Sequence, residues 1–154
     1  MPDDARPTPD LSELLCFAVY STSHAFNRVY KPLLEPLGLT YPQYLVMMQL
    51  WGQDGQTVGA LGSRLFLESN TLTPLLKRME AQGFVARGRD PSDERQVRVT
   101  LTARGRGLVE EARRVPGCIL EASGHRLEEL QRMTTELMAL REQLMQAGSE
   151  GEGA

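Results

Sequence analysis

The sequence contains few of the residues that build covalent or metal-stabilised scaffolds. Only two cysteines and two histidines occur among 154 residues, which excludes a disulfide-rich fold and argues against a bound metal. No stretch approaches the ~18 consecutive apolar residues of a membrane-spanning helix, and the acidic, proline-rich residues 1–10 lack the basic and apolar regions of a secretory signal. We therefore expect a cytoplasmic protein without membrane association, in which a disulfide would be transient and redox-linked.

Motifs for enzymatic chemistry are missing as well. The sequence has no glycine-rich phosphate loop and no Ser-His-Asp arrangement, and His24 and His125 are far apart and expected at the surface. A Pro-x-x-x-Ser/Thr-x-x-Cys arrangement, as in a thiol peroxidase, is also absent. We therefore expect a protein that is not an enzyme and that uses no cofactor.

Charge is unevenly distributed along a chain whose length suits one domain. The formal net charge is −3, yet residues 60–106 hold nine Lys or Arg and five Asp or Glu, a net charge of +4, which leaves −7 for the rest. A basic middle between acidic ends is typical of a DNA-binding module on an acidic scaffold, although a solvated charged face gives the same pattern.

Hydrophobic periodicity predicts helices on both sides of this basic middle. Asp10, with Glu13 three residues later, resembles a capping box and predicts a helix that starts at Asp10 and ends at about residue 36, after a disordered tail over residues 1–9. The stretch "TYPQYLVMMQLWG" predicts a second helix, capped near Thr40 or Tyr41, whose apolar residues surround it almost fully and indicate a buried core helix.

Two further helices are predicted towards the C-terminus. One spans residues 102–115 and is broken at Pro116 and Gly117, and the last spans about residues 123–146 with apolar residues spaced by three and four. Apolar stripes on the first and last helices favour a homodimer in which they pack against a second copy, although one monomer could also cover them. Residues 148–154 are expected to be a flexible tail.

The central segment has the pattern of a DNA-binding module. Apolar residues form two short helical sets over residues 58–65 and 69–82, separated at "LES", which predicts a helix-turn-helix. The alternating stretches "FVARG" and "QVRVTL", joined by "RDPSDER", predict a hairpin, or wing. We therefore predict a mainly α (α+β) single domain over residues 10–147, with a winged helix-turn-helix at residues 57–100 and dimerisation helices at 10–36 and 102–147.

Polar side chains of the second short helix lie off its apolar stripe. Pro74 is tolerated only near a helix start, which places the Ser and Thr hydroxyls at the N-terminal end of this helix. A recognition helix meets bases and phosphates at that end. N-capping by Ser69 and Thr71 would explain these hydroxyls equally well. At the wing tip, Arg95 can enter the minor groove while Asp93 fixes its direction, although both could be solvated charges. The predicted DNA-binding residues are Ser69, Asn70, Thr71, Thr73, Lys77, Arg78, Asp93 and Arg95.

The stretch "ALGSRLFLESNTLTPLLKRMEAQGFVARGRDPSDERQVRVTLTARG" resembles the winged helix of MarR-type transcriptional regulators, whose wing carries Asp-x-Arg followed by Leu-Thr-x-x-Gly. With "LCFAVY" and "YKPLLEPLGLTYPQYLVMMQLW", the resemblance extends over residues 14–101 to the organic-hydroperoxide-sensing repressors (OhrR) of that family. It implies a homodimeric repressor that releases operator DNA after reaction with an organic hydroperoxide. It also implies base or phosphate contacts for Ser69, Thr71 and Arg78, and a wing pair of Asp93 and Arg95.

The same resemblance assigns roles to both cysteines. Packing as a small hydrophobe is the simplest interpretation of Cys16, which lies in the apolar stretch "LLCFAVY". The resemblance implies instead that Cys16 is the peroxide sensor and that Tyr30 and Tyr41 hydrogen-bond its sulfur. Cys118 matches the approximate place of the resolving cysteine in a two-cysteine subgroup. Tyr20, four residues after Cys16, shares its helical face.

The chemistry of sensing limits which groups can act on this cysteine. A peroxide-reactive thiol reacts as a thiolate, but Cys16 lies about six residues past the predicted cap, where the helix dipole fades, and no cationic residue lies within a turn. Tyr30 is about 21 Å away along a continuous helix, so it can reach only the partner's Cys16 in an antiparallel dimer. Two alternatives stay open: a MarR-type repressor of a small apolar or phenolic ligand, and a thiol peroxidase.

Overall fold

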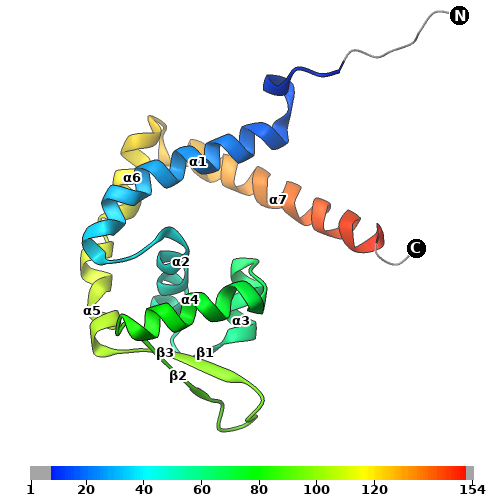
Figure 1. The fold of residues 1–154 in the computed structure, drawn as a ribbon. Coiled ribbons are helices and arrows are strands. Elements are labelled where there is room, and N and C mark those ends of the chain that lie inside the picture. Colours follow the sequence, from blue (N-terminus) through cyan, green and yellow to red (C-terminus); the bar gives the residue numbers. More distant parts are fainter. Residues whose placement is uncertain (1–7, 152–154) are drawn as a thin grey trace, which may run out of the picture. The chain divides into compact units, whose positions relative to one another are not determined.

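The computed structural model describes residues 8–151, which are mainly helical with one small three-stranded sheet (Figure 1). The predicted mainly α (α+β) class is confirmed. The chain divides into two compact units, one up to Val115 and one from Pro116 onward, and the predicted single domain stays a prediction. Residues 1–7 of the predicted N-terminal tail lie outside the described residues. Across the described range, no helix is both long and apolar enough to span a membrane.

Three helical segments open the first unit: η1 (Leu11–Glu13), α1 (Leu15–Leu34) and η2 (Glu35–Leu37). The Asp10 carboxylate caps the short 3-10 helix η1 by accepting a hydrogen bond from the Ser12 N–H at 2.8 Å. Leu14 is extended and separates η1 from α1. The prediction of one helix starting at Asp10 is therefore wrong, and Cys16 lies in the first turn of α1.

Helix α2 (Tyr41–Gly52) supplies much of the core of the first unit. Thr40 caps it as expected: its hydroxyl accepts from the Gln43 N–H, and the Gln43 side chain accepts from the Thr40 N–H at 3.1 Å, which completes a capping box. The prediction of a buried core helix holds only in part: Tyr44, Val46, Met47 and Leu50 are buried, but Met48 is 45% exposed.

The winged helix-turn-helix consists of β1 (Gln56–Thr57), α3 (Val58–Leu65), α4 (Ser69–Ala81), β2 (Val85–Arg89) and β3 (Val97–Leu101). The sheet order is β1-β3-β2, with both pairs antiparallel, and the β2–β3 hairpin extends beyond α4 as the predicted wing (Figure 1). Phe66 ends α3 in a left-handed conformation. The two-residue strand β1 was not predicted, because two residues are too few to show alternation.

Three helices follow the wing: α5 (Ala103–Ala112), α6 (Val115–Ser123) and α7 (Leu127–Gly151). The break after α5 falls at residues 113–114, while Pro116 and Gly117 lie in the first turn of α6. The predicted break at these two residues is wrong, because a proline in the first turn interrupts no hydrogen bond within the helix. The predicted flexible tail is also wrong over residues 148–151, where α7 continues; residues 152–154 lie outside the described range.

Candidate functional site

The start of α4 presents polar groups that the helix itself does not use. Ser69, Asn70 and Thr71 are exposed in its first turn, and the N-cap is Glu68, whose side chain makes no capping hydrogen bond. The alternative explanation of Ser69 and Thr71 as N-capping residues is therefore wrong. Positively polarised amides and hydroxyls at this helix start can meet phosphates or base edges.

The remaining candidates on α4 also lie off its buried face. Lys77 and Arg78 are exposed, and neither forms a salt bridge with an acidic side chain in the part of the chain described. Thr73 is half-buried beside a groove described below. The opposite face of α4 packs into the core through Leu72, Leu75, Leu76 and Met79.

The structure brings the predicted wing pair together. Asp93 Oδ1 accepts hydrogen bonds from the backbone N–H of Arg95 at 3.1 Å and from its Nε–H at 3.2 Å. The Gln96 side-chain amide donates to Asp93 Oδ2 at 3.4 Å. The Arg95 side chain is 91% exposed, so its guanidinium is oriented by Asp93 and remains accessible to a ligand.

A second carboxylate, which sequence reasoning missed, secures the wing loop where the chain leaves β2. Asp90 is only 3% exposed and accepts hydrogen bonds from the Ser92 N–H and hydroxyl and from Arg98 Nε at 3.0 Å. These bonds, those from Ser92 first, hold the pKa of Asp90 well below its usual range. Arg98 also donates to the Gly55 carbonyl. This link could have been found only from the hairpin register, which places Arg98 opposite Gly88.

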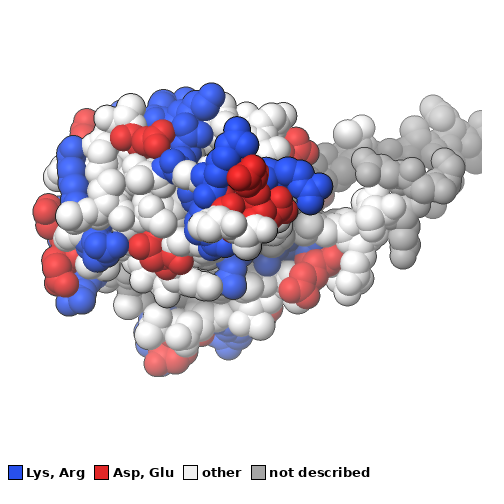
Figure 2. Space-filling view, turned by 90° about the horizontal axis from the view of Figure 1, so that it is seen from below, with Lys and Arg blue, Asp and Glu red and all other residues white. Residues whose placement is uncertain are grey.

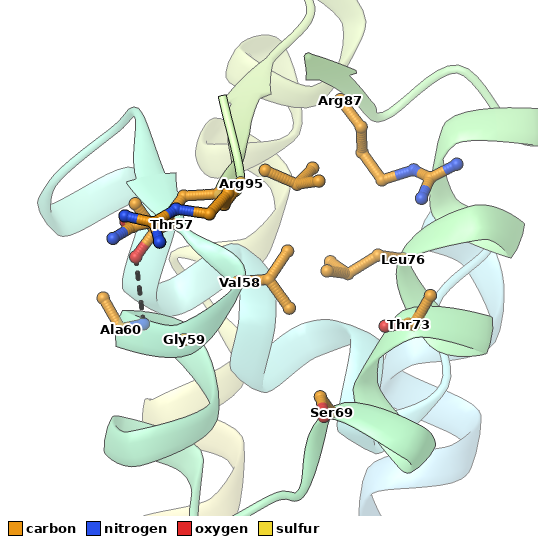
Figure 3. Close-up of a pocket in the computed structure, with 11 residues that line it drawn as sticks. Thr57, Val58, Gly59, Ala60, Ser69, Thr73, Leu76, Arg87 and Arg95 are labelled. Atoms are coloured by element: carbon orange, nitrogen blue, oxygen red, sulfur yellow. Dashed lines mark hydrogen bonds between the residues drawn. The ribbon is translucent and has the colours of Figure 1, made fainter. Parts of the chain in front are cut away.

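An ion pair that was also missed joins the wing to α4. Arg87 of β2 donates from Nε and Nη2 to Glu80 Oε2 at 3.1 and 3.0 Å, and its backbone N–H donates to Glu80 Oε1 at 3.1 Å. The backbone hydrogen bond is the main reason that the pKa of Glu80 is lowered. Arg87, Arg95, Ser69 and Thr73 all line an open groove of about 590 Å³ between α4, the start of α3 and the wing (Figure 3).

The surface on the side of the hairpin carries both signs of charge. Figure 2 shows clusters of Lys and Arg side chains on this face, with Asp and Glu side chains among them. Each of three arginines in the wing is paired with an acid: Asp93 binds Arg95 and Asp90 binds Arg98 within the wing, and Glu80 of α4 binds Arg87. The acids therefore orient cationic groups on this face.

Cys16 and Tyr20 lie towards the N-terminal end of α1. Cys16 is an exposed free thiol in the first turn, where the helix dipole favours negative charge. This corrects the expectation that the dipole has faded at Cys16. Tyr20 is 62% exposed and packs edge-on against the exposed His24, with ring centroids 4.5 Å apart. Cys118 is a half-buried free thiol of α6.

The three other tyrosines, Tyr30, Tyr41 and Tyr44, lie together where the C-terminal part of α1 meets α2. The ring centroids of Tyr30 and Tyr41 are 4.6 Å apart, and those of Tyr30 and Tyr44 are 5.9 Å apart. Burial, with smaller contributions from Tyr41 and Tyr44, raises the pKa of Tyr30 to about 12. Tyr44 was missed, although its i, i+3 spacing from Tyr41 in a predicted helix was a usable signal. Cys16 lies at the opposite end of α1 from this cluster.

A pair of glutamines connects the start of α2 with the end of α4. The buried Gln43 side chain donates to Gln82 Oε1 at 3.0 Å, and the Gln82 side chain donates to the Gly38 carbonyl at 3.2 Å. Gln82 is the C-cap residue of α4, and Arg104 Nη1 donates to its carbonyl at 2.7 Å. A hydrogen-bonded path therefore runs from the turn before Tyr41 to the end of α4.

Residues 8–151 contain no group of three or more His, Cys, Asp or Glu side chains positioned to hold a metal ion. His24 and His125 are both exposed, as expected.

Comparison with known proteins matches this geometry to transcriptional regulators. The family model described as transcriptional regulator SarA/Rot matches residues 28–112. The HTH-type transcriptional regulator TtmR of Methylorubrum extorquens is 48% identical over 151 residues, which cover 97% of this chain and 77% of that protein. The organic hydroperoxide resistance transcriptional regulator of Bacillus subtilis is 45% identical over 136 residues, which cover 88% of this chain and 92% of that protein.

Solved structures of AbfR from Staphylococcus epidermidis have the same fold. Reduced AbfR bound to DNA superposes with a TM-score of 0.74 at 38% identity, covering 88% of this chain and 94% of AbfR. The disulfide form of AbfR matches with a TM-score of 0.62 at 40% identity, covering 83% and 92% of the two chains. The protein is therefore a DNA-binding transcriptional regulator and belongs to the winged-helix regulators of the MarR/SarA type.

Proposed function

We propose that this regulator is a repressor that binds operator DNA as a homodimer and releases it when an organic hydroperoxide oxidises Cys16. The observation that carries the proposal is the position of Cys16, an exposed thiol in the first turn of α1. Its neighbours Leu15, Phe17 and Val19 are exposed apolar side chains, which favour an organic peroxide over a hydrophilic one. The similarity to a regulator named for organic hydroperoxide resistance supports the same function.

The proposed dimer accounts for apolar surface on both long helices. α1 in the first unit and α7 in the second each expose large apolar side chains, which a second copy can bury. Tyr30 is about 21 Å from Cys16 along α1, so an antiparallel pairing of the two α1 helices brings it to the partner's Cys16. The exposed residues are Leu15, Phe17, Val19, Tyr20 and Phe26 on α1, and Leu127, Met133, Leu137, Met138, Leu144 and Met145 on α7.

The reaction needs one thiolate and one proton donor. The Cys16 thiolate attacks an oxygen of the hydroperoxide, the O–O bond breaks, and the sulfur becomes a sulfenic acid while the alkoxide takes a proton and leaves as an alcohol. Tyr30, with a pKa of about 12, remains a neutral phenol that can donate a hydrogen bond to the reacting atoms. The Cys118 thiolate then attacks the sulfenic sulfur, which forms a disulfide and releases water.

Release of DNA requires that a change near the tyrosines reaches α4. In our proposal, Tyr41, the first residue of α2, shifts with Tyr30 when Cys16 is oxidised. The capping box at Thr40 and the Gln43–Gln82 hydrogen bond then carry the shift to the C-terminal end of α4. A small rotation of α4 in each subunit would change the spacing of the two recognition helices and lower the affinity for a palindromic site.

Paired cysteine variants test this function. We expect cumene hydroperoxide to release the wild-type protein from a palindromic promoter fragment in a gel shift, reversibly with dithiothreitol, and to produce a reducible dimer band on a non-reducing gel. Cys16→Ser should stay bound throughout. Cys118→Ser should still respond, but its oxidation should become irreversible. Release of Cys16→Ser by the peroxide would contradict the sensor assignment, and wild-type reversibility of Cys118→Ser would contradict only the resolving role.

A small-molecule effector is the second candidate. An open groove of about 470 Å³ lies beside the tyrosine cluster and is lined by Asn27, Lys31 and Tyr41, among others, which favours an apolar or phenolic ligand with one acidic or hydroxyl group. Such a ligand would release wild type and Cys16→Ser equally from the promoter fragment. Equal release by salicylate, with no effect of cumene hydroperoxide, would support this candidate against the first.

A further inference from the structure

The groove between α4 and the wing has a defined place in a DNA complex. A winged helix that inserts α4 into the major groove and the hairpin into the adjacent minor groove must accommodate the sugar-phosphate strand that separates the two grooves. That strand lies between the two inserted elements. The groove of about 590 Å³ is bounded by both α4 and the wing: Ser69 and Thr73 line it from α4, and Arg95 lines it from the wing (Figure 3).

Arg87 is the cation at the inner side of this groove. It extends from β2 next to α4, across the groove from Arg95 (Figure 3), and its side chain remains 23% exposed. We propose that Arg87 binds a phosphate of this strand and that Glu80 is the positioning residue that holds Arg87 for the contact. This role differs from those predicted for Arg78, a recognition-helix contact, and for Arg95, a minor-groove contact at the wing tip.

The hydrogen bonds of Arg87 leave donors for such a contact. A guanidinium has five N–H donors, and Glu80 Oε2 accepts from one on Nε and one on Nη2. Both N–H groups of Nη1 and one of Nη2 remain for phosphate oxygens. Because the Glu80 carboxylate and the backbone N–H of Arg87 already fix the arginine, less side-chain entropy is lost on binding than for a free arginine.

The pair makes a prediction that a purely structural tether does not. Glu80→Gln leaves the charge of Arg87 in place but offers one acceptor oxygen where Glu80 uses two, so it should hold Arg87 less well and weaken binding slightly. Arg87→Gln removes the cation and leaves Glu80 facing the phosphate strand. A phosphate contact therefore lowers the salt dependence only in Arg87→Gln, whereas a structural tether weakens binding in both variants and leaves the salt dependence unchanged.

Binding to duplex DNA of random sequence tests the proposal, since phosphate contacts are independent of sequence. The reduced full-length protein is used, so the result does not depend on peroxide sensing. In fluorescence anisotropy at fixed salt, Arg87→Gln should weaken binding about tenfold, as expected for loss of a charge-assisted hydrogen bond, and reduce the slope of log K against log salt by about 0.9. Glu80→Gln should weaken binding by up to about threefold and keep the wild-type salt slope, because the charge of Arg87 remains.

Two further variants complete the test. Arg113→Gln removes an exposed arginine paired with Glu110 on α5 and serves as the charge-matched control, with affinity within about twofold of wild type. Arg87→Lys keeps the charge and should retain the salt slope while losing part of the affinity. Equal weakening by Arg87→Gln and Glu80→Gln, or an unchanged salt slope in Arg87→Gln, would overturn the proposal; unfolding curves confirm that each variant is folded.

Discussion

Replacing Asp93 with asparagine separates two opposite effects of an acidic side chain in the wing loop, which we propose to contact DNA. By charge alone, removing an acid from this surface should strengthen DNA binding. The structure predicts the reverse, because Asp93 Oδ1 accepts hydrogen bonds from both the backbone N–H and the Nε–H of Arg95. Without the carboxylate, the 91% exposed Arg95 side chain is free to sample other rotamers before it binds.

The size of the effect follows from the entropy of that side chain. A free arginine carries about 2 kcal/mol of rotamer entropy, of which an exposed ion pair recovers about 0.2–1 kcal/mol. Asp93→Asn should therefore weaken binding by about 0.2–1 kcal/mol, or up to about fivefold. Arg95→Ala removes the contact itself and should cost about 1–3 kcal/mol.

Fluorescence anisotropy with a promoter duplex that has A·T-rich flanks measures these differences at one ionic strength. Glu94→Gln is the matched control, because Glu94 is the neighbouring exposed acid and its side chain forms no salt bridge within the described residues. It should bind DNA as well as the wild type or better. If Asp93→Asn also binds tighter than the wild type, Asp93 does not orient Arg95 and the reasoning is refuted.

Three further predictions concern stability and titration. A Cβ on Gly105 would overlap the Phe84 carbonyl oxygen, whereas a Cβ on Gly107 meets nothing within 4 Å. Urea unfolding should therefore show that Gly105→Ala lowers the free energy of unfolding by about 1–3 kcal/mol and that Gly107→Ala raises it by up to about 1 kcal/mol. Equal effects of the two substitutions would contradict this packing. Folding raises the pKa of Tyr30 to about 12, so its contribution to stability is complete below about pH 10 and is lost as the pH rises towards 12. A pH titration followed by tyrosinate absorbance should show an ionisation step near the upper end of this range that Tyr30→Phe lacks. Folding lowers the pKa of Asp90, so its contribution to stability is present above about pH 4 and is lost as the pH falls below that value. Asp90→Asn should therefore reduce the dependence of unfolding free energy on pH in the acid range. An unchanged dependence would contradict the role of Asp90 in holding the wing.

Helices and strands that are indicated by the periodicity of neighbouring residues were predictable from the sequence. The helix-turn-helix and wing follow from a change of apolar period, from helical spacing in α3 and α4 to alternation in β2 and β3. Errors arose where two local signals compete: Asp10 caps a 3-10 helix instead of α1, and Pro116 opens a helix although it was interpreted as a break. The strand β1 depends on pairing with β3, which its two residues cannot indicate.

In the candidate site, too, positions set by local sequence were predictable, whereas contacts between different elements were not. The positions of Ser69 at a helix start and of Arg95 in a hairpin loop were predictable because both features are recognisable from local sequence. The partners Glu80 and Arg87 lie on different elements, so their contact depends on how β2 packs against α4, which the sequence does not specify by spacing. Cys16 was correctly separated from Tyr30 by helix length alone, but its place in the first turn of α1 depended on the break at Leu14.

Titration of the DNA-bound protein with an organic hydroperoxide tests the central claim most directly. A labelled promoter duplex saturated with reduced protein is followed by anisotropy while cumene hydroperoxide is added in fractions of an equivalent per chain, in parallel for wild type and Cys16→Ser. We predict that wild type leaves the DNA as the peroxide approaches one equivalent per chain and rebinds after dithiothreitol, while Cys16→Ser stays bound. Retention of the wild type on DNA, or equal release of both proteins, would contradict the account.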